Sequence, residues 1–212
     1  MKRTILYLLP TLFLLMGLLS WSAGQTKDIL QQPLTQQYLA QLKKDFNYQP
    51  EQLLVLISAA KQELYLVQNG KVTATYKVST SKKGIGSKAG SDKTPPGIHR
   101  IKEKFGDGAK VGAIFKGRAY IGREAEIITE PISINSDDVT TRILWLDGLE
   151  PGINKGEGID SYKRYIYIHG TPEEGLIGQP ASHGCIRMLN KEVIELFNKV
   201  PIGTLVVVLN DL

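Results

Sequence analysis

Short apolar runs separated by turns dominate the hydrophobic pattern of the chain. Residues 53–57 form one such run, residues 63–68 and 71–79 form two more, and Asn69-Gly70 separates the last two. Asn-Gly between two β-rich runs is a strong hairpin signal, because both central positions of the turn need a positive φ. Similar apolar runs predict further strands at residues 98–102, 142–146, 164–168 and 204–209.

One helix is predicted near the C-terminus. Residues 191–199 place Val193 and Leu196 on one apolar face, Asn190 is the expected N-cap, and Pro201 follows the last turn. Short strands joined by turns, with one short late helix, predict a mostly β domain.

Two regions give no regular element. Residues 81–96 are rich in Gly, Ser and Lys, which predicts a loop with either a binding role or simple mobility. The glycines from Gly84 to Gly90 lack the Gly-Lys-Ser/Thr ending of a phosphate-binding loop and precede strands, so that function is excluded. Residues 105–141 are expected to be irregular.

The N-terminal segment differs from the rest of the chain. Lys2 and Arg3 precede an apolar stretch over residues 4–21, and small residues follow at 22–24. This layout predicts a secretory signal over residues 1–24; the alternative is an uncleaved membrane anchor, because the apolar stretch reaches the lower edge of the spanning length. Residues 25–50 read as a tether or a short packing helix, and residues 51–212 as the folded domain.

Charge adds little to this picture. The chain has 212 residues and a formal net charge of +5, with 42% hydrophobic and 22% charged residues, which is ordinary globular composition. No block of Lys or Arg indicates nucleic acid. A weak attraction to an anionic envelope polymer is one interpretation, but a solvated surface of mixed sign is favoured.

The single cysteine, Cys185, points to chemistry. Exported domains usually pair their cysteines, whereas one thiol cannot form an internal disulfide and stays available. Cys185 lies in the run 182–188 (Ser-His-Gly-Cys-Ile-Arg-Met), and His169-Gly170 precedes it. A thiolate nucleophile and an imidazole that carries the proton are the groups that covalent catalysis requires. We therefore interpret these residues as a cysteine acyl-transfer site.

Neighbouring residues leave alternatives open. In an extended segment Arg187 lies on the same side as Cys185, where it is placed to bind a substrate carboxylate; the other interpretation is a surface ion pair. His183 is close enough in sequence to replace His169 as the base. A zinc site formed by His169, His183 and Cys185 is a further alternative, although the His-x-Cys spacing is unusually close for joint ligation.

Residues 165–171, Gly178 and residues 182–188 together resemble the active-site signature of the L,D-transpeptidase catalytic domain family, and the similarity extends from about Gln52 to the C-terminus. The resemblance implies a β-sandwich or barrel-like catalytic domain over residues 51–212 that cross-links peptidoglycan. In such enzymes the cysteine attacks a stem tetrapeptide, D-alanine leaves, and an amine of another stem resolves the thioester.

The resemblance also implies residue roles. Cys185 is the expected nucleophile and His169 the base, with its second ring nitrogen on a backbone carbonyl near Gly170. The backbone amides of His183, Gly184 and Cys185 are expected to bind the oxyanion. The residues expected to contact the substrate are Arg187, Ser182 and Gly170.

We expect an exported monomer in the periplasm or cell envelope, with peptidoglycan stem peptides as partners and no metal or organic cofactor. A membrane contact would come only from an uncleaved leader. The acceptor stays open: water would make the enzyme an L,D-carboxypeptidase or cross-link hydrolase, and a protein lysine would attach wall peptides to protein. A non-catalytic wall-binding module is a lower-ranked alternative.

The sequence also predicts where four other residues lie. Glu173 and Glu174 are expected on a solvated loop, Trp145 in the core, and Tyr120 in a flap over the site.

Overall fold

The computed structural model describes residues 29–134 and 137–210, so the predicted leader over residues 1–24 lies outside the described residues. Within the described part, no helix is long and apolar enough to span a membrane. The elements are α2 (Pro33–Phe46), β1 (Leu54–Ser58), β2 (Glu63–Gln68), β3 (Lys71–Ser79), β4 (Gly97–Phe105), β5 (Ala113–Lys116), β6 (Ala119–Glu124), β7 (Val139–Gly148), β8 (Tyr167–Gly170), a 3-10 turn (Glu174–Leu176), β9 (Ile186–Met188), α3 (Asn190–Lys199) and β10 (Leu205–Leu209).

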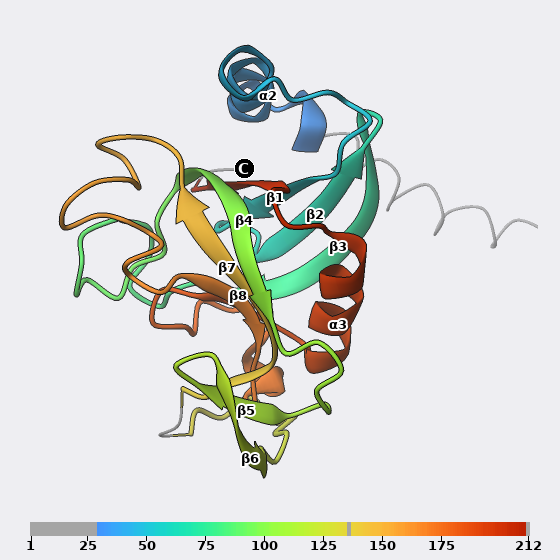
Figure 1. The fold of residues 1–212 in the computed structure, drawn as a ribbon, viewed down its shortest axis with the longest axis vertical. Coiled ribbons are helices and arrows are strands. Elements are labelled where there is room, and N and C mark those ends of the chain that lie inside the picture. Colours follow the sequence, from blue (N-terminus) through green and yellow to red (C-terminus); the bar gives the residue numbers. More distant parts are fainter. Residues whose placement is uncertain (1–28, 135–136, 211–212) are drawn as a thin grey trace, which may run out of the picture.

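The strands form one sheet that closes on itself, which confirms the predicted mostly β, barrel-like fold. The strand order is β4-β10-β1-β2-β3-β9-β8-β7-β5-β6, and an additional β4–β7 pairing closes the barrel. Most neighbours are antiparallel, but β8 and β9 run parallel, with Ile168 opposite Ile186 and His169 opposite Arg187. In Figure 1, helix α2 and the β5–β6 hairpin lie at opposite ends of the molecule.

Alternating side chains along the strands build separate apolar clusters on the two faces of the sheet. Ile168 and Ile186 belong to the main core, which helix α3 covers with Val193 and Leu196. Leu42 of α2 is buried in a second cluster, so residues 25–50 contain the packing helix rather than only a tether. A third cluster contains Trp145 and Tyr167 and is contacted by Cys185.

Several predicted elements match the structure closely. The predicted strands 63–68 and 71–79 are β2 and β3, and the intervening Asn69 and Gly70 have φ of 53° and 65°, as the hairpin requires. Trp145 is buried, as expected.

Other predicted elements begin at a different residue in the structure. The strand expected at 164–168 begins only at Tyr167, because Asp160 holds the preceding turn through its carbonyl to the Arg164 amide and Tyr165 adopts a φ of 57°. Asn190 is the first residue of α3 rather than its N-cap; its side-chain amide donates instead to the carbonyl oxygen of Thr171. Strands β5, β6 and β9 were not predicted.

Candidate active site

The parallel pairing of β8 and β9 brings the two halves of the sequence motif together. His169 of β8 lies opposite Arg187 of β9, and Ile186 points into the main core. Because side chains alternate along a strand, Cys185 and Arg187 both face away from that core, on the same side as His169. The outer face of this strand pair therefore holds the predicted nucleophile and the predicted base.

The Cys185 sulfur is held by the backbone of the segment that leads into β8. The Tyr167 N–H donates to Sγ at 3.4 Å, and the thiol lies 3.3 Å from the Tyr165 carbonyl oxygen, to which it donates. Burial raises the pKa of the Cys185 thiol to about 12, while the Tyr167 amide and the nearby guanidinium groups of Arg187 and Arg164 act in the opposite direction. With this raised pKa, the resting sulfur is mainly a thiol at neutral pH.

His169 is held in one ring orientation by the residue that follows it. Its Nδ1 lies 2.6 Å from the Gly170 carbonyl oxygen, the kind of acceptor that the family resemblance implies. Nδ1 must carry the proton to donate to a carbonyl, and this tautomer leaves the lone pair on Nε2. Burial lowers the pKa of His169 to about 4, although the Asp137 carboxylate opposes the shift. The ring is therefore neutral and able to accept a proton at pH 7.

A tight turn over residues 182–185 precedes β9. Ser182 is buried; its hydroxyl donates to the Cys185 carbonyl at 2.6 Å and accepts the Gly184 N–H at 3.2 Å. Gly184 has a φ of 127°, which side chains disfavour, and a Cβ there would lie 3.3 Å from the Lys93 carbonyl oxygen. The Ser182 hydroxyl thus holds the turn together, and the Gly184 amide already has a partner inside the turn.

The surroundings of Gly170 leave no room for a side chain. It is buried in β8, and a Cβ there would lie 2.4 Å from the Asn190 side-chain oxygen and 2.9 Å from the Thr140 carbonyl oxygen. The close approach of these groups explains the glycine. Gly170 is buried, and its carbonyl orients the imidazole.

Arg187 differs most from the sequence expectation. Its side chain is 2% exposed; one terminal nitrogen donates to Glu173 at 2.7 Å and the other contacts Asp137. Strand alternation does put Arg187 on the face of Cys185, but the two carboxylates cover the guanidinium. Neither the open carboxylate-binding role nor the surface ion pair describes this group.

Glu173 and Asp137 were not recognised as part of the site. Glu173 is buried rather than solvated; besides Arg187, it accepts the Ser133 hydroxyl at 3.0 Å and the Ile134 N–H at 2.5 Å. Burial alone would raise the pKa of Asp137, but Arg187, His169 and His183 together lower it. The available signal was indirect: an arginine on a buried strand needs carboxylate partners.

His183 lies at the exposed edge of this ion-pair cluster. Its Nδ1 is 2.8 Å from Asp137 Oδ2, and its side chain is 42% exposed. The ring thus has a carboxylate partner on Asp137, while His169 is buried and has a backbone partner. Among the described residues, no three His, Cys, Asp or Glu side chains gather as a metal-binding group, so His169, His183 and Cys185 are not assembled into the alternative zinc site.

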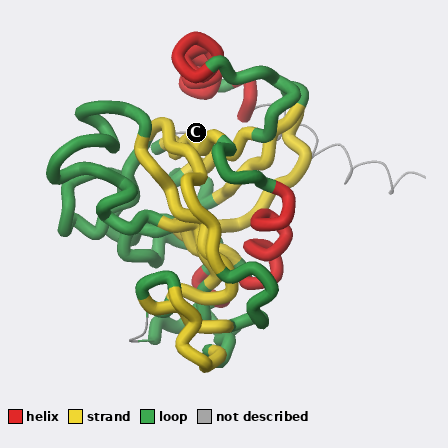
Figure 2. The backbone as a smooth tube through the Cα atoms, in the orientation of Figure 1, coloured by secondary structure: helices red, strands yellow, loops and turns green. Residues whose placement is uncertain are grey.

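A pocket of about 270 Å³ opens beside Cys185. Its lining includes the nucleophile, His183 and residues of the loop 81–96. This loop is fastened to the turn of the nucleophile: the Lys82 amide donates to the Ser182 carbonyl at 3.1 Å, and Ser81 pairs with Ser182. Of the two roles considered for the loop, the binding role fits this place. Figure 2 shows the long loops gathered on one side of the sheet.

The residues for which a flap was predicted form the β5–β6 hairpin. Arg118, in its turn, lies 4.4 Å from the centre of the Trp145 ring and donates to the Tyr167 hydroxyl at 3.3 Å. Tyr167 is the residue whose amide bonds to the Cys185 sulfur, so the hairpin is connected to the nucleophile. Tyr120 is 47% exposed and donates to Glu124 at 2.8 Å.

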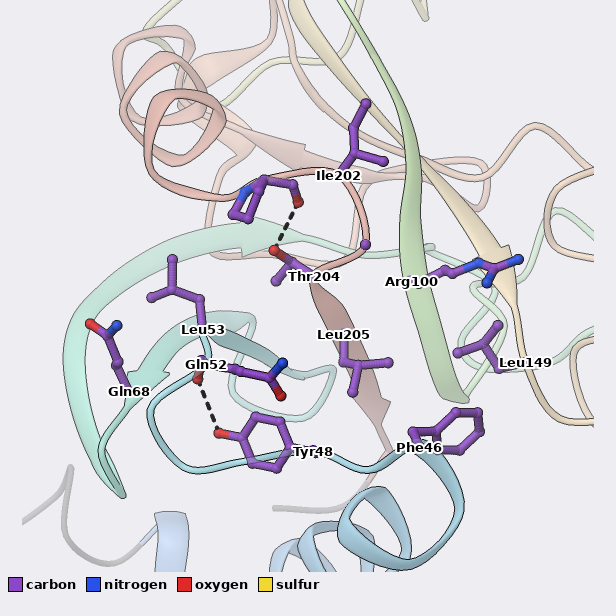
Figure 3. A pocket seen from close by; sticks show the side chains of 12 residues that line it. Phe46, Tyr48, Gln52, Leu53, Gln68, Arg100, Leu149, Ile202, Thr204 and Leu205 are labelled. Atoms are coloured by element: carbon purple, nitrogen blue, oxygen red, sulfur yellow. Dashed lines mark hydrogen bonds between the residues drawn. The ribbon is translucent and has the colours of Figure 1, made fainter.

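A second cavity, of about 680 Å³, lies away from these residues. Phe46, Tyr48, Arg100 and Leu205 are among the side chains around it (Figure 3). Its lining includes no predicted site residue, and Arg100 is paired with Asp147 at 3.0 Å.

A model of the L,D-transpeptidase catalytic domain family matches residues 52–208, and the chain therefore belongs to this family. L,D-transpeptidases are transferases that act on peptidoglycan stem peptides. YqjB of Bacillus subtilis (strain 168), which is named as an L,D-transpeptidase, is 29% identical over 157 residues, 74% of this chain and 71% of YqjB. YkuD of the same organism, named likewise, is 52% identical over 46 residues, 22% of this chain and 28% of YkuD.

Solved structures give similar matches. An L,D-transpeptidase from Mycobacterium smegmatis has a TM-score of 0.47 and 17% identity, over 74% of this chain and 58% of the other. L,D-transpeptidase 3 from Mycobacterium tuberculosis, solved with a faropenem-derived adduct, has a TM-score of 0.45 and 16% identity, over 74% and 59%. The chain covers less than two thirds of the length of these two structures.

Proposed function

We propose that this chain is an exported L,D-transpeptidase that uses Cys185 as its nucleophile on peptidoglycan stem tetrapeptides. His169 Nε2 takes the thiol proton while Sγ bonds to the carbonyl carbon between the third residue and the terminal D-alanine. The C–N bond then breaks, D-alanine leaves with the proton returned by His169, and a thioester remains. An amine of a second stem attacks the thioester and loses a proton to His169, which returns it to the departing sulfur.

The observation that carries this proposal is the contact between His169 Nδ1 and the Gly170 carbonyl oxygen. The Nδ1 contact to Gly170 leaves the Nε2 lone pair for the thiol, and both groups lie on one face of the β8–β9 pair. The raised pKa of Cys185 and the lowered pKa of His169 describe a neutral pair at pH 7. Proton transfer then accompanies attack, since no standing thiolate exists beforehand.

The test is to incubate the purified chain with a disaccharide-tetrapeptide and identify the products by mass. Cross-linked dimer plus D-alanine is the expected result. D-Alanine with tripeptide alone would indicate water as the acceptor, and no release of D-alanine would contradict the proposal. Cys185→Ala is expected to abolish turnover while keeping the circular dichroism spectrum, because the thiol is the only nucleophile proposed.

An acylating β-lactam gives an independent readout of the nucleophile. The LD transpeptidase LdtMt1 has been solved in complex with imipenem. Imipenem is expected to add its mass to Cys185 of this chain and to leave the Cys185→Ala protein unmodified. An adduct on another residue would argue against the assignment.

The two histidines can be separated by matched substitutions. His169→Gln should lower kcat by at least about 100-fold, the usual contribution of a general base. His183→Gln should have a much smaller effect, because the His183 ring pairs with Asp137 at the exposed edge of the site. The reverse order would assign His183 as the base.

Export is part of the proposal and rests on residues 1–24 of the sequence. Fusing residues 1–30 to alkaline phosphatase, which is active only after export, should give active enzyme in the bacterial envelope. Replacing Leu8 and Leu14 by Asp should abolish that activity, because charges interrupt the apolar stretch. Equal activity of both fusions would contradict export.

A further inference from the structure

The pocket beside Cys185 carries positive charge that the acyl-transfer chemistry leaves unused. Lys163 and Arg164 line it together with the nucleophile, and its one carboxylate, Asp92, is already paired with Lys83 at 2.8 Å. We refer to this 270 Å³ space as the Arg164 pocket.

Arg164 is held in place by the loop that forms the pocket wall. One terminal nitrogen donates to the Lys93 carbonyl at 2.6 Å and the other to the Gly86 carbonyl at 3.3 Å, and the side chain is partly buried. Among the described residues, no carboxylate lies in ion-pair contact with Arg164. A guanidinium has five N–H donors, so donors remain for a ligand.

The proposed reaction brings one anion close to this place. The leaving D-alanine has a carboxylate that is separated from the attacked carbonyl carbon only by its nitrogen and its Cα. With bond lengths of about 1.3 to 1.5 Å, the carboxyl carbon lies within about 4 Å of the attacked carbon. The carboxylate must therefore sit in the space next to the sulfur, and Cys185 itself lines the Arg164 pocket.

We propose that the Arg164 pocket binds the free carboxylate of the residue that leaves, with Arg164 as the residue that determines this specificity. The proposal rests on the proposed function and adds the donor requirement. A planar guanidinium can bind a carboxylate through two parallel hydrogen bonds. If the terminal carboxylate of the donor is amidated or joined to a further residue, a neutral amide lies against the Arg164 guanidinium instead.

The test compares two donors that differ only in charge: the tetrapeptide stem with a free terminal carboxylate and the same stem with a terminal carboxamide. For the wild-type protein we expect kcat/KM to be higher on the acid by tenfold or more, an order of magnitude typical of a charge-assisted hydrogen bond. Arg164→Gln should reduce this ratio toward one, because kcat/KM falls further on the acid than on the carboxamide. Lys163→Gln should reduce it less, because Lys163 is an exposed side chain.

Lys71→Gln is the matched control, because it removes an exposed charge from strand β3 without touching the pocket. Its acid-to-amide ratio should equal that of the wild type. Since Arg164 also anchors loop carbonyls, Arg164→Lys, which keeps the charge, should retain part of the discrimination in a folded protein. An Arg164→Gln enzyme that is active and keeps the full wild-type ratio would overturn the inference.

Binding separates the failure of this inference from failure of the proposed function. Calorimetry on the Cys185→Ala protein measures affinity for both donors without chemistry. The pocket is supported if Cys185→Ala binds the acid more tightly than the amide and Cys185→Ala/Arg164→Gln does not. This conclusion holds even if the wild type does not release D-alanine. Equal affinity for acid and amide contradicts the pocket, even if the wild type proves to be a transpeptidase.

Discussion

Two arginines lie near Cys185, and their surroundings differ. Arg187 is 2% exposed and neutralised by Glu173 and Asp137. Arg164 is partly buried, is held by two backbone carbonyls and borders an open pocket. The sequence motif drew attention to Arg187, because it is two positions from the nucleophile. The surroundings of each guanidinium, not its sequence distance from the cysteine, separate a structural ion pair from a candidate binding group.

The largest expected effect tests the structural role of Arg187. Arg187→Met should destabilise the protein by about 3–5 kcal/mol, because it leaves the buried Glu173 carboxylate without its cation. Urea unfolding followed by circular dichroism measures the loss. The double variant Glu173→Gln/Arg187→Met should recover part of it, since no charge is then buried. A stability loss in Arg187→Met below about 1 kcal/mol would show that the pair is not structural.

An intermediate effect is expected in the reactivity of the Cys185 thiol, whose pKa both arginines influence. Burial raises the pKa of Cys185 to about 12, so the thiolate fraction at pH 7 is small and grows with pH. Alkylation by iodoacetamide at pH 7 should be at least about tenfold slower in the folded protein than in denaturant. The folded rate should continue to rise between pH 8 and 10.

Both arginines lower the pKa of this thiol. Arg164→Gln should therefore slow alkylation further at every pH in that range, whereas Lys71→Gln should not. A folded rate that is already constant above pH 7 would instead indicate a standing thiolate, and with it a different starting state for the reaction.

The smallest expected effect is the change in stability caused by replacing Arg164. Arg164→Gln should lower the free energy of unfolding by about 1–3 kcal/mol, because it removes two hydrogen bonds from a partly exposed side chain and leaves no buried carboxylate behind. The same urea experiment measures it. A loss as large as that of Arg187→Met would mean that Arg164 mainly holds the loop together.

Local signals predicted the parts of the molecule that depend on local chemistry. The hairpin at Asn69-Gly70 follows from the positive φ that these residues accept, and the helix ending before Pro201 follows from its apolar spacing. The acceptor of His169 is likewise local, because it is the carbonyl of the next residue.

Long-range partners were beyond the reach of sequence patterns. Asp137 lies in a region without regular periodicity, and Glu173 resembles any loop glutamate until the fold brings it against Arg187. Arg164 was assigned to a strand because residues 164–168 are rich in β-forming types. The turn held by Asp160 instead places Arg164 beside the pocket.

The loop 81–96 is fastened to the nucleophile turn at Ser81 and Ser182, yet it belongs to neither β8 nor β9. Loop residues other than Ser81, Lys82 and Lys93 can therefore diverge without disturbing the strands that align thiol and imidazole. Grafting this loop between related proteins offers a way to change which leaving group is accepted while Cys185 and His169 are kept.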